Sequence, residues 1–510
     1  MSTELPVLAV KAGAAIREHV LANGLRVLLV ERHLDPVVAV MLWYRVGSRD
    51  EVDEIAGVSH FLEHMMFKGS ARFGKGEVDR VTTLLGGSNN AFTTNDHTAY
   101  WFELASDRFE AALEIEADRM RALLLDPVEF AAEKDVVLEE LAMGRDDPWR
   151  RLTELVQEGV FGRHPYRRPI IGHADALKRL SVEELRAHHS RHYRPSNAIL
   201  VLSGDFQPER ALELVERHLG TVAPPPLAVR ETFRPAIEEP PGEKRLSMTW
   251  DDEGQRLCMA WPSGAVGTPT DWTLDVVSTL LTGGRLSRLH RRLVLEQGLA
   301  TTVSTQNDAR VDGGAFWLMA ECAQGTAPSV LEAAIDAELA RLWEEAVPAA
   351  ELERAKRILI SGEAYDSETV SDLAEELGEF AIDADWRLSL QTVDRIRAVT
   401  ARDVRETART ILSAARRTLA WSLPRERSIA ARRSPRKAAK RSPRGTAPRI
   451  PKRSAQGAPK SAATSAPKRK TPAAKRTGRR TAPGARRGAP ATARSTARGA
   501  AGSQAERSGR

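Results

Sequence analysis

The sequence predicts an α+β protein built from two similar halves and followed by a basic extension. Apolar strand patterns at residues 25–31 and 37–46 occur among long helical patterns, which is typical of α+β domains. A segment beginning at Ser181 aligns without gaps with one beginning at Thr400, an offset of 219 residues. Both copies predict a helix followed by a strand, so we expect the two halves to share one architecture.

A Pro-rich stretch marks the expected junction between the halves. We expect an N-terminal domain over 1–222, a linker over 223–244, a C-terminal domain over 245–424 and a tail over 425–510. The 510 residues suffice for two or three domains, and 42% of them are hydrophobic and can supply the cores. No apolar run is long enough to cross a membrane, so membrane insertion is not expected.

Positive charge is concentrated in the tail. Residues 425–510 hold 26 Lys and Arg against two acidic residues, a charge of +24, and the preceding residues carry −18, which together give the net +6. The tail lacks aromatic residues, and Ile429 and Ile450 are its only large apolar residues, so we expect it to be disordered. It could contact a polyanion nonspecifically or serve only as a solubilising extension. A protein whose whole function is polyanion binding would leave its acidic remainder unexplained.

The run His60-Phe61-Leu62-Glu63-His64 is the most informative chemical signal in the chain. The apolar residues around it have the spacing of a buried helical stripe: Val58, Phe61, Leu62, Met65 and Met66. His60 and His64 are then one turn apart on another face, where both imidazoles can reach one zinc ion with Glu63 beside it. The ordinary alternative is a pair of surface histidines on an amphipathic helix.

A second helical segment offers a further ligand. A catalytic zinc ion usually takes three protein ligands and one water molecule. Glu133 and Glu140 are seven residues apart and share one face of the predicted helix. Such a pair alone is most often a solvated helix face, and it is the position relative to the histidines that favours Glu140 as a ligand.

These motifs resemble those of the insulinase and pitrilysin zinc peptidases, which carry the inverted zinc motif. The resemblance covers roughly residues 15–424 and includes His60–Gly69, Gly86–Thr93 and Tyr193–Asn197. It implies one zinc ion per chain and the following roles: His60, His64 and Glu140 as ligands, Glu63 as general base and Glu133 as a carboxylate that orients a ligand.

The resemblance also implies an activity and an architecture. The expected activity is hydrolysis of extended or unfolded peptides, by two α+β halves that form a clamshell, with the metal site in the first half only. Asn90 and Ala91 would lie on an edge strand that pairs with the peptide backbone. The alternative there is a turn, because residues 86–89 are all turn formers.

The second half departs from the family pattern at two positions. Active members usually carry an Arg and a Tyr that hold the substrate and stabilise the oxyanion, where this chain has Val294 and Thr301. Arg291 or Arg292 could substitute from about one turn earlier, the positions could simply pack in a self-sufficient protein, or a homologous noncatalytic subunit could supply the pair. We favour the subunit, because neither Val nor Thr is a cation or a phenol donor. The rival function is a noncatalytic processing or assembly subunit of the same fold.

The remaining reactive side chains predict structural roles. Cys258 and Cys322 lie in apolar strand-like segments, which predicts buried free thiols. His188, His189 and His192 cluster in a helix beginning near residue 181, where we expect a solvated polar face and not a second metal site. No signal-peptide core precedes the first strand, so a cytoplasmic location is expected.

Overall fold

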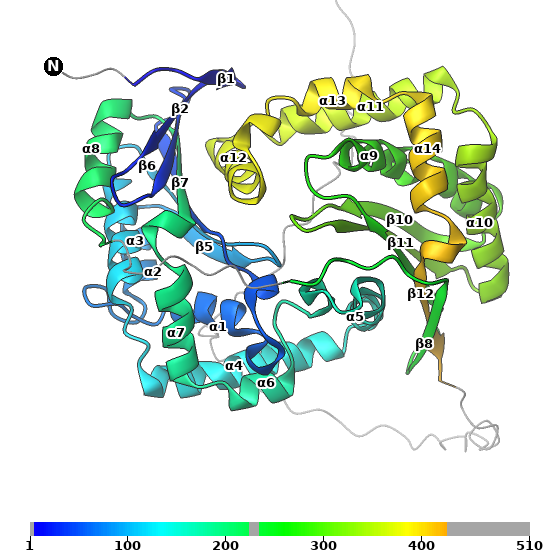
Figure 1. The fold of residues 1–510 in the computed structure, drawn as a ribbon, viewed down its shortest axis with the longest axis horizontal. Coiled ribbons are helices and arrows are strands. Elements are labelled where there is room, and N and C mark those ends of the chain that lie inside the picture. The colour runs from blue at the N-terminus through cyan, green and yellow to red at the C-terminus, as the bar shows by residue number, and fades with distance from the viewer. Residues whose placement is uncertain (1–4, 224–233, 426–510) are drawn as a thin grey trace, which may run out of the picture. The chain divides into compact units, whose positions relative to one another are not determined.

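The computed structural model describes residues 5–223 and 234–425. This part of the chain forms two mixed β-sheets with helices packed against them (Figure 1). The expected α+β class with two similar halves is confirmed. Residues 426–510 of the predicted tail and residues 224–233 of the predicted linker lie outside the described residues.

The first sheet has seven strands in the order β1-β2-β3-β7-β4-β6-β5. Its strands β3 and β7 are parallel, and the other neighbours are antiparallel. In chain order the strands are β1 (Ala9–Lys11), β2 (Ala14–Val20), β3 (Arg26–Glu31), β4 (Val37–Tyr44), β5 (Ser88–Thr93), β6 (Thr98–Ala105) and β7 (Ala198–Gly204). Strands β3 and β4 confirm the two strands expected from the sequence.

The second sheet has five strands in the order β10-β11-β9-β12-β8, with β12 and β8 parallel and the other pairs antiparallel. Its strands are β8 (Lys244–Trp250), β9 (Arg256–Ser263), β10 (Ala300–Asp308), β11 (Gly314–Cys322) and β12 (Thr418–Pro424). Read from β8 to β10, this sheet repeats the order β3-β7-β4-β6-β5 of the first, including its single parallel pair. The halves therefore share one topology.

Helices line both sheets. Those of the first half are α1 (Val58–Met65), α2 (Glu77–Leu84), α3 (Glu110–Ala122), α4 (Pro127–Arg145), α5 (Pro148–Phe161), α6 (Ala174–Arg179), α7 (Val182–His192) and α8 (Pro208–His218). Those of the second half are α9 (Pro269–Thr282), α10 (Pro328–Glu344), α11 (Ala349–Tyr365), α12 (Val370–Asp383), α13 (Thr392–Ala398) and α14 (Ala401–Ile411). A π-helical segment at His290–Glu296 lies between α9 and β10.

Helices α7 and α14 explain the repeat in the sequence. Each begins with a capping box, in which a hydroxyl accepts the N–H of the third helical residue and that residue's carboxylate accepts the N–H of the cap. The pairs are Ser181 with Glu184 and Thr400 with Asp403. The caps are 219 residues apart, and each helix leads to a central strand, β7 or β12, as the aligned segments predict.

Each half gives one helix to the sheet of the other half (Figure 1). From the first half, α5 packs on the second sheet through Leu152, Val156 and Val160 against Cys258, Ala260 and Ala420. From the second half, α12 packs on the first sheet through Leu373, Leu377 and Ala381 against Met41, Trp43 and Val201. A Cβ atom at Gly378 would lie 2.1 Å from Nε1 of Trp43, so α12 approaches the first sheet as closely as a glycine allows. A helix from each half thus covers part of the sheet of the other half.

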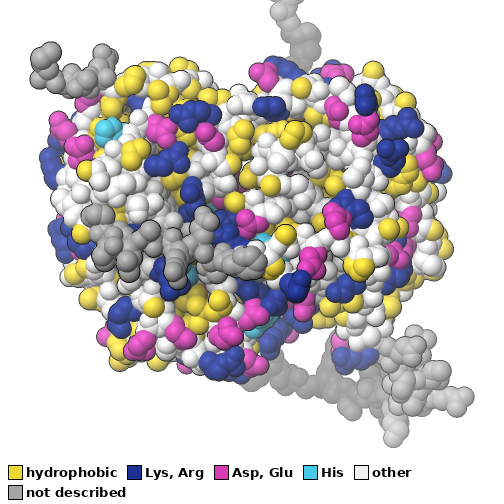
Figure 2. Space-filling view, in the orientation of Figure 1, with side chains coloured by type: hydrophobic (Ala, Val, Ile, Leu, Met, Phe, Trp, Pro, Cys, Tyr) yellow, Lys and Arg dark blue, Asp and Glu magenta, His cyan; other side chains and the backbone are white. Residues whose placement is uncertain are grey.

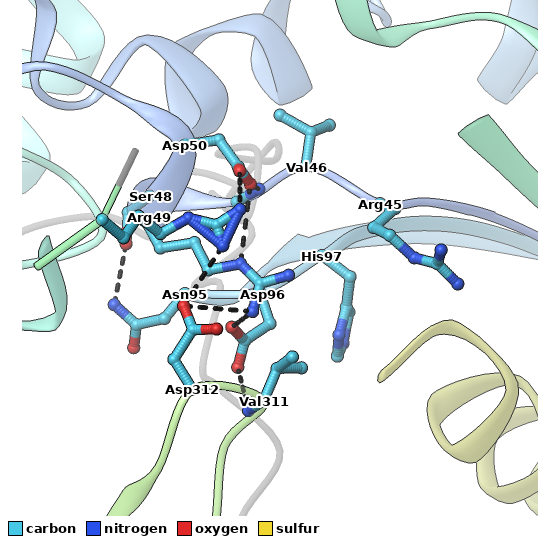
Figure 3. Close-up of polar contacts among 12 residues, drawn as sticks. Arg45, Val46, Ser48, Arg49, Asp50, Asn95, Asp96, His97, Val311 and Asp312 are labelled. Carbon is cyan, nitrogen blue, oxygen red and sulfur yellow. Dashed lines mark hydrogen bonds and ion pairs between the residues drawn. The ribbon is translucent and has the colours of Figure 1, made fainter. Parts of the chain in front are cut away.

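A buried polar network joins the halves near the turn between β5 and β6 (Figure 3). Asp96 in this turn lies 2.6 Å from Nη1 of Arg49 and accepts the N–H of Val311 at 3.4 Å. The hydroxyl of Tyr166 donates to Asp96 and accepts the N–H of Asp312 at 3.1 Å. The turn that follows the first sheet's edge strand is therefore held against the β10–β11 connection of the second half.

His97 extends this network to α12 and predicts a pH-dependent stability. Its Nδ1 lies 2.9 Å from Oδ1 of Asp383, and the ring is buried. Burial alone would lower the pKa of His97, but Asp383, by charge and hydrogen bond, and the charges of Glu379 and Asp96 raise the pKa above its ordinary value. The folded protein thus binds this proton more tightly than the unfolded chain, and the stabilisation is complete below the unfolded pKa and is lost as pH rises through the folded pKa.

We expect the free energy of unfolding to fall by about 1.5–3 kcal/mol more in the native chain than in His97→Gln as pH is raised from 6 to 9, the value of a hydrogen bond to a charged group. Urea unfolding at several pH values measures this. His173→Gln, at an exposed histidine, is the control and should follow the native curve. Parallel curves for the native chain and His97→Gln would show that the pair does not titrate in this range.

Other features of the described residues agree with the sequence. Cys258 and Cys322 are free and buried, as predicted. No helix in residues 5–223 and 234–425 has both the length and the apolar character needed to cross a bilayer. On the face shown in Figure 2, basic and acidic side chains are interspersed. This mixing is the pattern of an ordinary charged protein surface.

Candidate metal centre

The buried carboxylate of Glu51 fixes the start of α1. It accepts the N–H groups of Gly57 and Ser59, both at 2.8 Å, and so pairs donors that the helix itself leaves unpaired. Burial raises the pKa of Glu51 to about 7, although these N–H groups act in the opposite direction. Gly57 has φ +100°, and a Cβ atom there would lie 2.5 Å from the carbonyl oxygen of Ile171. Sequence reasoning missed Glu51; its signal is an acidic residue ahead of a helix whose glycine cap lacks a side chain.

Helix α1 turns two histidine side chains toward α4. The ring centroids of His60 and His64 are 4.8 Å apart, and Phe61 packs against Phe130 of α4 on the neighbouring face, with ring centroids 5.1 Å apart. Oε2 of Glu140 lies 3.9 Å from Nε2 of His60 and 3.6 Å from Nε2 of His64. The structure therefore brings together the three predicted ligands, although Glu140 follows His64 by 76 residues along the chain.

The spacing of these atoms suits zinc. Ligand atoms of the three side chains all lie within 4.8 Å of one another. Tetrahedral bonds of about 2.0–2.1 Å place ligand atoms roughly 3.4 Å apart, so a small inward movement of the side chains would complete a site. Nε2 of His64 is buried and has no hydrogen-bond partner among the described residues, as expected of a nitrogen that faces a metal. Two imidazoles and one carboxylate are a common catalytic zinc set.

The electrostatic surroundings keep His60 neutral. Burial, followed by the positive charges of His64 and Arg150, lowers the pKa of His60 to about 3. A neutral imidazole is the form that binds a metal ion. His60 can therefore bind zinc without first losing a proton at neutral pH.

Glu133 orients His64. Its Oε1 lies 2.9 Å from Nδ1 of His64, and its Oε2 lies 2.5 Å from Nζ of Lys68. Burial would raise the pKa of Glu133, but the hydrogen bonds from His64 and Lys68 outweigh it and lower the pKa. A carboxylate at Nδ1 fixes the proton on that nitrogen and leaves the lone pair of Nε2, on the side of Glu140, available to a metal ion. Lys68 was not singled out in the sequence, although it lies one turn past His64.

Glu63 lies next to the ligands and is 5% exposed. Its Oε2 accepts a hydrogen bond of 2.6 Å from Oγ1 of Thr93, the last residue of β5. Burial raises the pKa of Glu63, the charge of Glu140 acts in the same direction, and Thr93 and His64 oppose it. A carboxylate with a raised pKa is a better proton acceptor than an exposed one. Sequence reasoning missed Thr93 as the hydrogen-bond partner of Glu63.

Asn90 and Ala91 lie on β5, the terminal strand of the first sheet, as expected. They pair with Trp101 and Tyr100 of β6, and Oδ1 of Asn90 accepts the N–H of Ala91 at 2.9 Å. Both alternatives from the sequence are partly realised, because Gly86 ends the preceding helix with φ +75° and the edge strand begins at Ser88. The strand ends at Thr93, whose hydroxyl donates to Glu63.

The solvated face predicted for the α7 histidines is wrong. His188, His189 and His192 are all buried. Nε2 of His188 lies 3.1 Å from Oγ of Ser59, and Nε2 of His189 lies 3.1 Å from the carbonyl oxygen of Arg119. Burial lowers the pKa of His189 and of His192 to about 4, so both rings are neutral packing residues. With Leu185 they form the i, i+3, i+4, i+7 stripe of a buried face, which outweighs their polarity.

Comparison with known proteins agrees with this site. The family model for insulinase (peptidase family M16) matches residues 26–174, and the model for the peptidase M16 inactive domain matches residues 179–359. An uncharacterized zinc protease of Mycobacterium bovis is 30% identical over 412 residues, which cover 79% of this chain and 92% of that protein. The chain belongs to the insulinase family, peptidase family M16. All three candidate ligands lie in the part matched by the first model.

Further relatives and solved structures agree with this chain in sequence and fold. The zinc protease PqqE of Helicobacter pylori is 28% identical over 370 residues, 72% of this chain and 83% of that protein. A crystal structure of a protease from Helicobacter pylori has a TM-score of 0.78 and 25% identity and covers 81% of this chain and all of the other. A peptidase M16 inactive domain from Pseudomonas fluorescens shares the fold, with a TM-score of 0.73 and 20% identity.

The second half has neither a cation nor a phenol at positions 294 and 301, where the sequence departs from the family pattern. Val294 packs against the core of the second half, and Oγ1 of exposed Thr301 donates to the carbonyl oxygen of Glu321 at 3.4 Å. Arg291 and Arg292 both pair with Glu296, at 3.4 and 3.2 Å. The two arginines weighed as substitutes are therefore engaged in local ion pairs on the π-helical segment.

Proposed function

We propose that this M16 protein is a zinc-dependent endopeptidase that hydrolyses extended or unfolded peptides. The observation that supports it most is the convergence of His60, His64 and Glu140 on one point, with Glu63 beside them and held by Thr93. We assign the three ligands to one zinc ion per chain, Glu63 to the general base and Glu133 to the orientation of His64. The names of the relatives as zinc proteases support the same metal and reaction class.

We assign the proton transfers to Glu63. Zinc, when bound, polarises the scissile carbonyl and activates a water molecule at neutral pH. Because Thr93 donates to Oε2 of Glu63, Oε1 is the atom we assign to take the proton of the attacking water. Glu63 then returns this proton to the nitrogen of the leaving amine, and the peptide bond breaks. The burial that raises the pKa of Glu63 favours its role as acceptor in the first step.

We assign peptide binding to the free edge of β5. An extended peptide can add to an edge strand through its backbone, largely without regard to side chains. Asn90 and Ala91 lie on that edge, three and two residues before Thr93, so a paired peptide would run toward Glu63. Backbone pairing of this kind selects unfolded segments over folded proteins.

We further propose that a homologous noncatalytic subunit supplies the Arg and Tyr missing at Val294 and Thr301. The same departure supports a second candidate function, in which this chain is itself a noncatalytic processing or assembly subunit. The complete set of three ligands and Glu63 favours catalysis. A chain that binds peptide but hydrolyses none in any mixture would instead favour the noncatalytic role. A cytoplasmic location and polyanion contact through residues 425–510 stay predictions.

Metal removal tests the proposed function. We expect the chelator-treated chain to lose peptide hydrolysis and to regain it with one equivalent of zinc, because the three ligands form one site. Elemental analysis and a fluorogenic unfolded peptide provide the measurements. His60→Ala should bind no zinc at this site, and His173→Ala, at an exposed histidine, should bind it normally. Equal hydrolysis with and without metal would rule out a zinc peptidase.

A further inference from the structure

The connection between α4 and α5 places a cation beside the metal-binding face of α4. Gly144 follows Glu140 by four residues, so it lies one helical turn further along the same face. A Cβ atom at Gly144 would meet the guanidinium of Arg150 at 2.4–2.7 Å, so this group rests directly on the backbone of α4. Arg150 therefore lies near the ligands without being one of them.

Arg150 shares its acidic partner with a second arginine. Its Nε lies 3.3 Å from Oε1 of Glu154, but Oε2 of Glu154 lies 2.5 Å from Nη1 of Arg151, so two guanidinium groups share one carboxylate. The side chain of Asp147 accepts the N–H groups of Trp149 and Arg150 at the start of α5. About a third (34%) of the Arg150 side chain is exposed, so a solute can reach it.

We propose that Arg150 is a specificity-determining residue that binds the carboxylate of an Asp or Glu side chain of the peptide, close to the scissile bond. This inference rests on the proposed function. A turn of helix advances about 5.4 Å, which places Arg150 beyond contact with a carbonyl held at the metal. An extended peptide advances about 3.3 Å per residue, so a side chain one or two residues from the scissile bond can reach the guanidinium of Arg150. A guanidinium binds a carboxylate through two parallel hydrogen bonds.

Cleavage-site profiling tests the proposal. The zinc-loaded chain and its variants digest a mixture of unfolded proteins, and mass spectrometry identifies the cleaved bonds. We expect Asp and Glu to be enriched at one position within two residues of the bond in the native chain. Arg150→Ala should abolish this enrichment, and Arg150→Glu should replace it with Lys and Arg. The control is Arg151→Ala, which removes the other cation that pairs with Glu154 and should keep the enrichment of Asp and Glu.

Matched peptides with Glu or Gln at that position give the magnitude. We expect the native chain to favour the Glu peptide about tenfold in kcat/KM, through KM, and Arg150→Ala to lose the preference, because a charge-assisted hydrogen bond is replaced by water. Unchanged profiles in Arg150→Ala would overturn the proposal.

A binding measurement separates this proposal from the proposed function. Fluorescence anisotropy with the zinc-loaded Glu63→Gln variant reports affinity for the same two peptides without turnover. Tighter binding of the Glu peptide that is lost on adding Arg150→Ala supports the role of Arg150, even where no chain hydrolyses peptide. Equal binding of both peptides overturns it. Absence of hydrolysis by the native chain, both alone and mixed with the homologous subunit, by contrast counts against the proposed function.

Discussion

Replacing Glu63 by Gln is expected to lower kcat for peptide hydrolysis about 10²- to 10⁴-fold while zinc remains bound, the range for loss of a general base. Gln keeps the size of the side chain and an oxygen that can accept the hydrogen bond from Thr93, so the packing around α1 is preserved. It cannot take a proton from water. KM should change little, because the proposed peptide site is the edge of β5 and not Glu63. Elemental analysis and steady-state kinetics on one sample provide both measurements.

The matched control is Glu139→Gln, which makes the same change on the exposed side of α4 next to Glu140. It should retain both zinc and turnover. Unchanged turnover in Glu63→Gln would remove Glu63 as the base. Loss of turnover together with loss of zinc would show instead that Glu63 supports the site structurally.

The metal centre could be predicted because its signals are local. The histidine pair lies within one turn of α1, and an apolar stripe on another face fixes which way it points. The location of Glu140 depended on a resemblance, because spacing alone does not distinguish a ligand from a solvated helix face. Glu51 and Thr93 were missed for a physical reason, because each acts through hydrogen bonds that no periodicity records. Glu51 accepts two backbone N–H groups across the loop before α1, and Thr93 donates to Glu63, 30 residues earlier in the chain.

The same distinction holds for the fold. The two-half topology left a trace in the sequence, since α7 and α14 start with the same capping box before equivalent strands. The packing of α5 and α12 on the sheet of the opposite half left no trace in the sequence. The apolar stripe of a helix shows that the helix is buried but not which sheet covers it. The α7 histidines were mispredicted because polarity was weighed above spacing, whereas a neutral, hydrogen-bonded imidazole can be buried at low cost.

The purified chain is expected to hydrolyse unfolded peptides about 100- to 1,000-fold more slowly than a mixture with a homologous subunit that carries Arg and Tyr at the positions of Val294 and Thr301. This range is the usual cost of losing an oxyanion donor. Val294 is half-buried against the core of the second half and Thr301 is hydrogen-bonded to the backbone, so neither position offers a replacement. Titrating the partner against a fixed amount of chain, with kcat and KM measured separately, tests the expectation.

A second copy of this chain cannot replace that subunit, because every copy carries Val294 and Thr301. Rate enhancement should therefore require the heterologous partner and be absent at any concentration of the chain alone. Thr301→Tyr in the partner-free chain is a useful comparison, since residue 301 is exposed and accepts a larger side chain without repacking. A partner whose Tyr is replaced by Phe should lose most of the enhancement while still binding, because only the hydroxyl donates. Full activity of the single chain would mean that another donor, already within these 510 residues, stabilises the oxyanion.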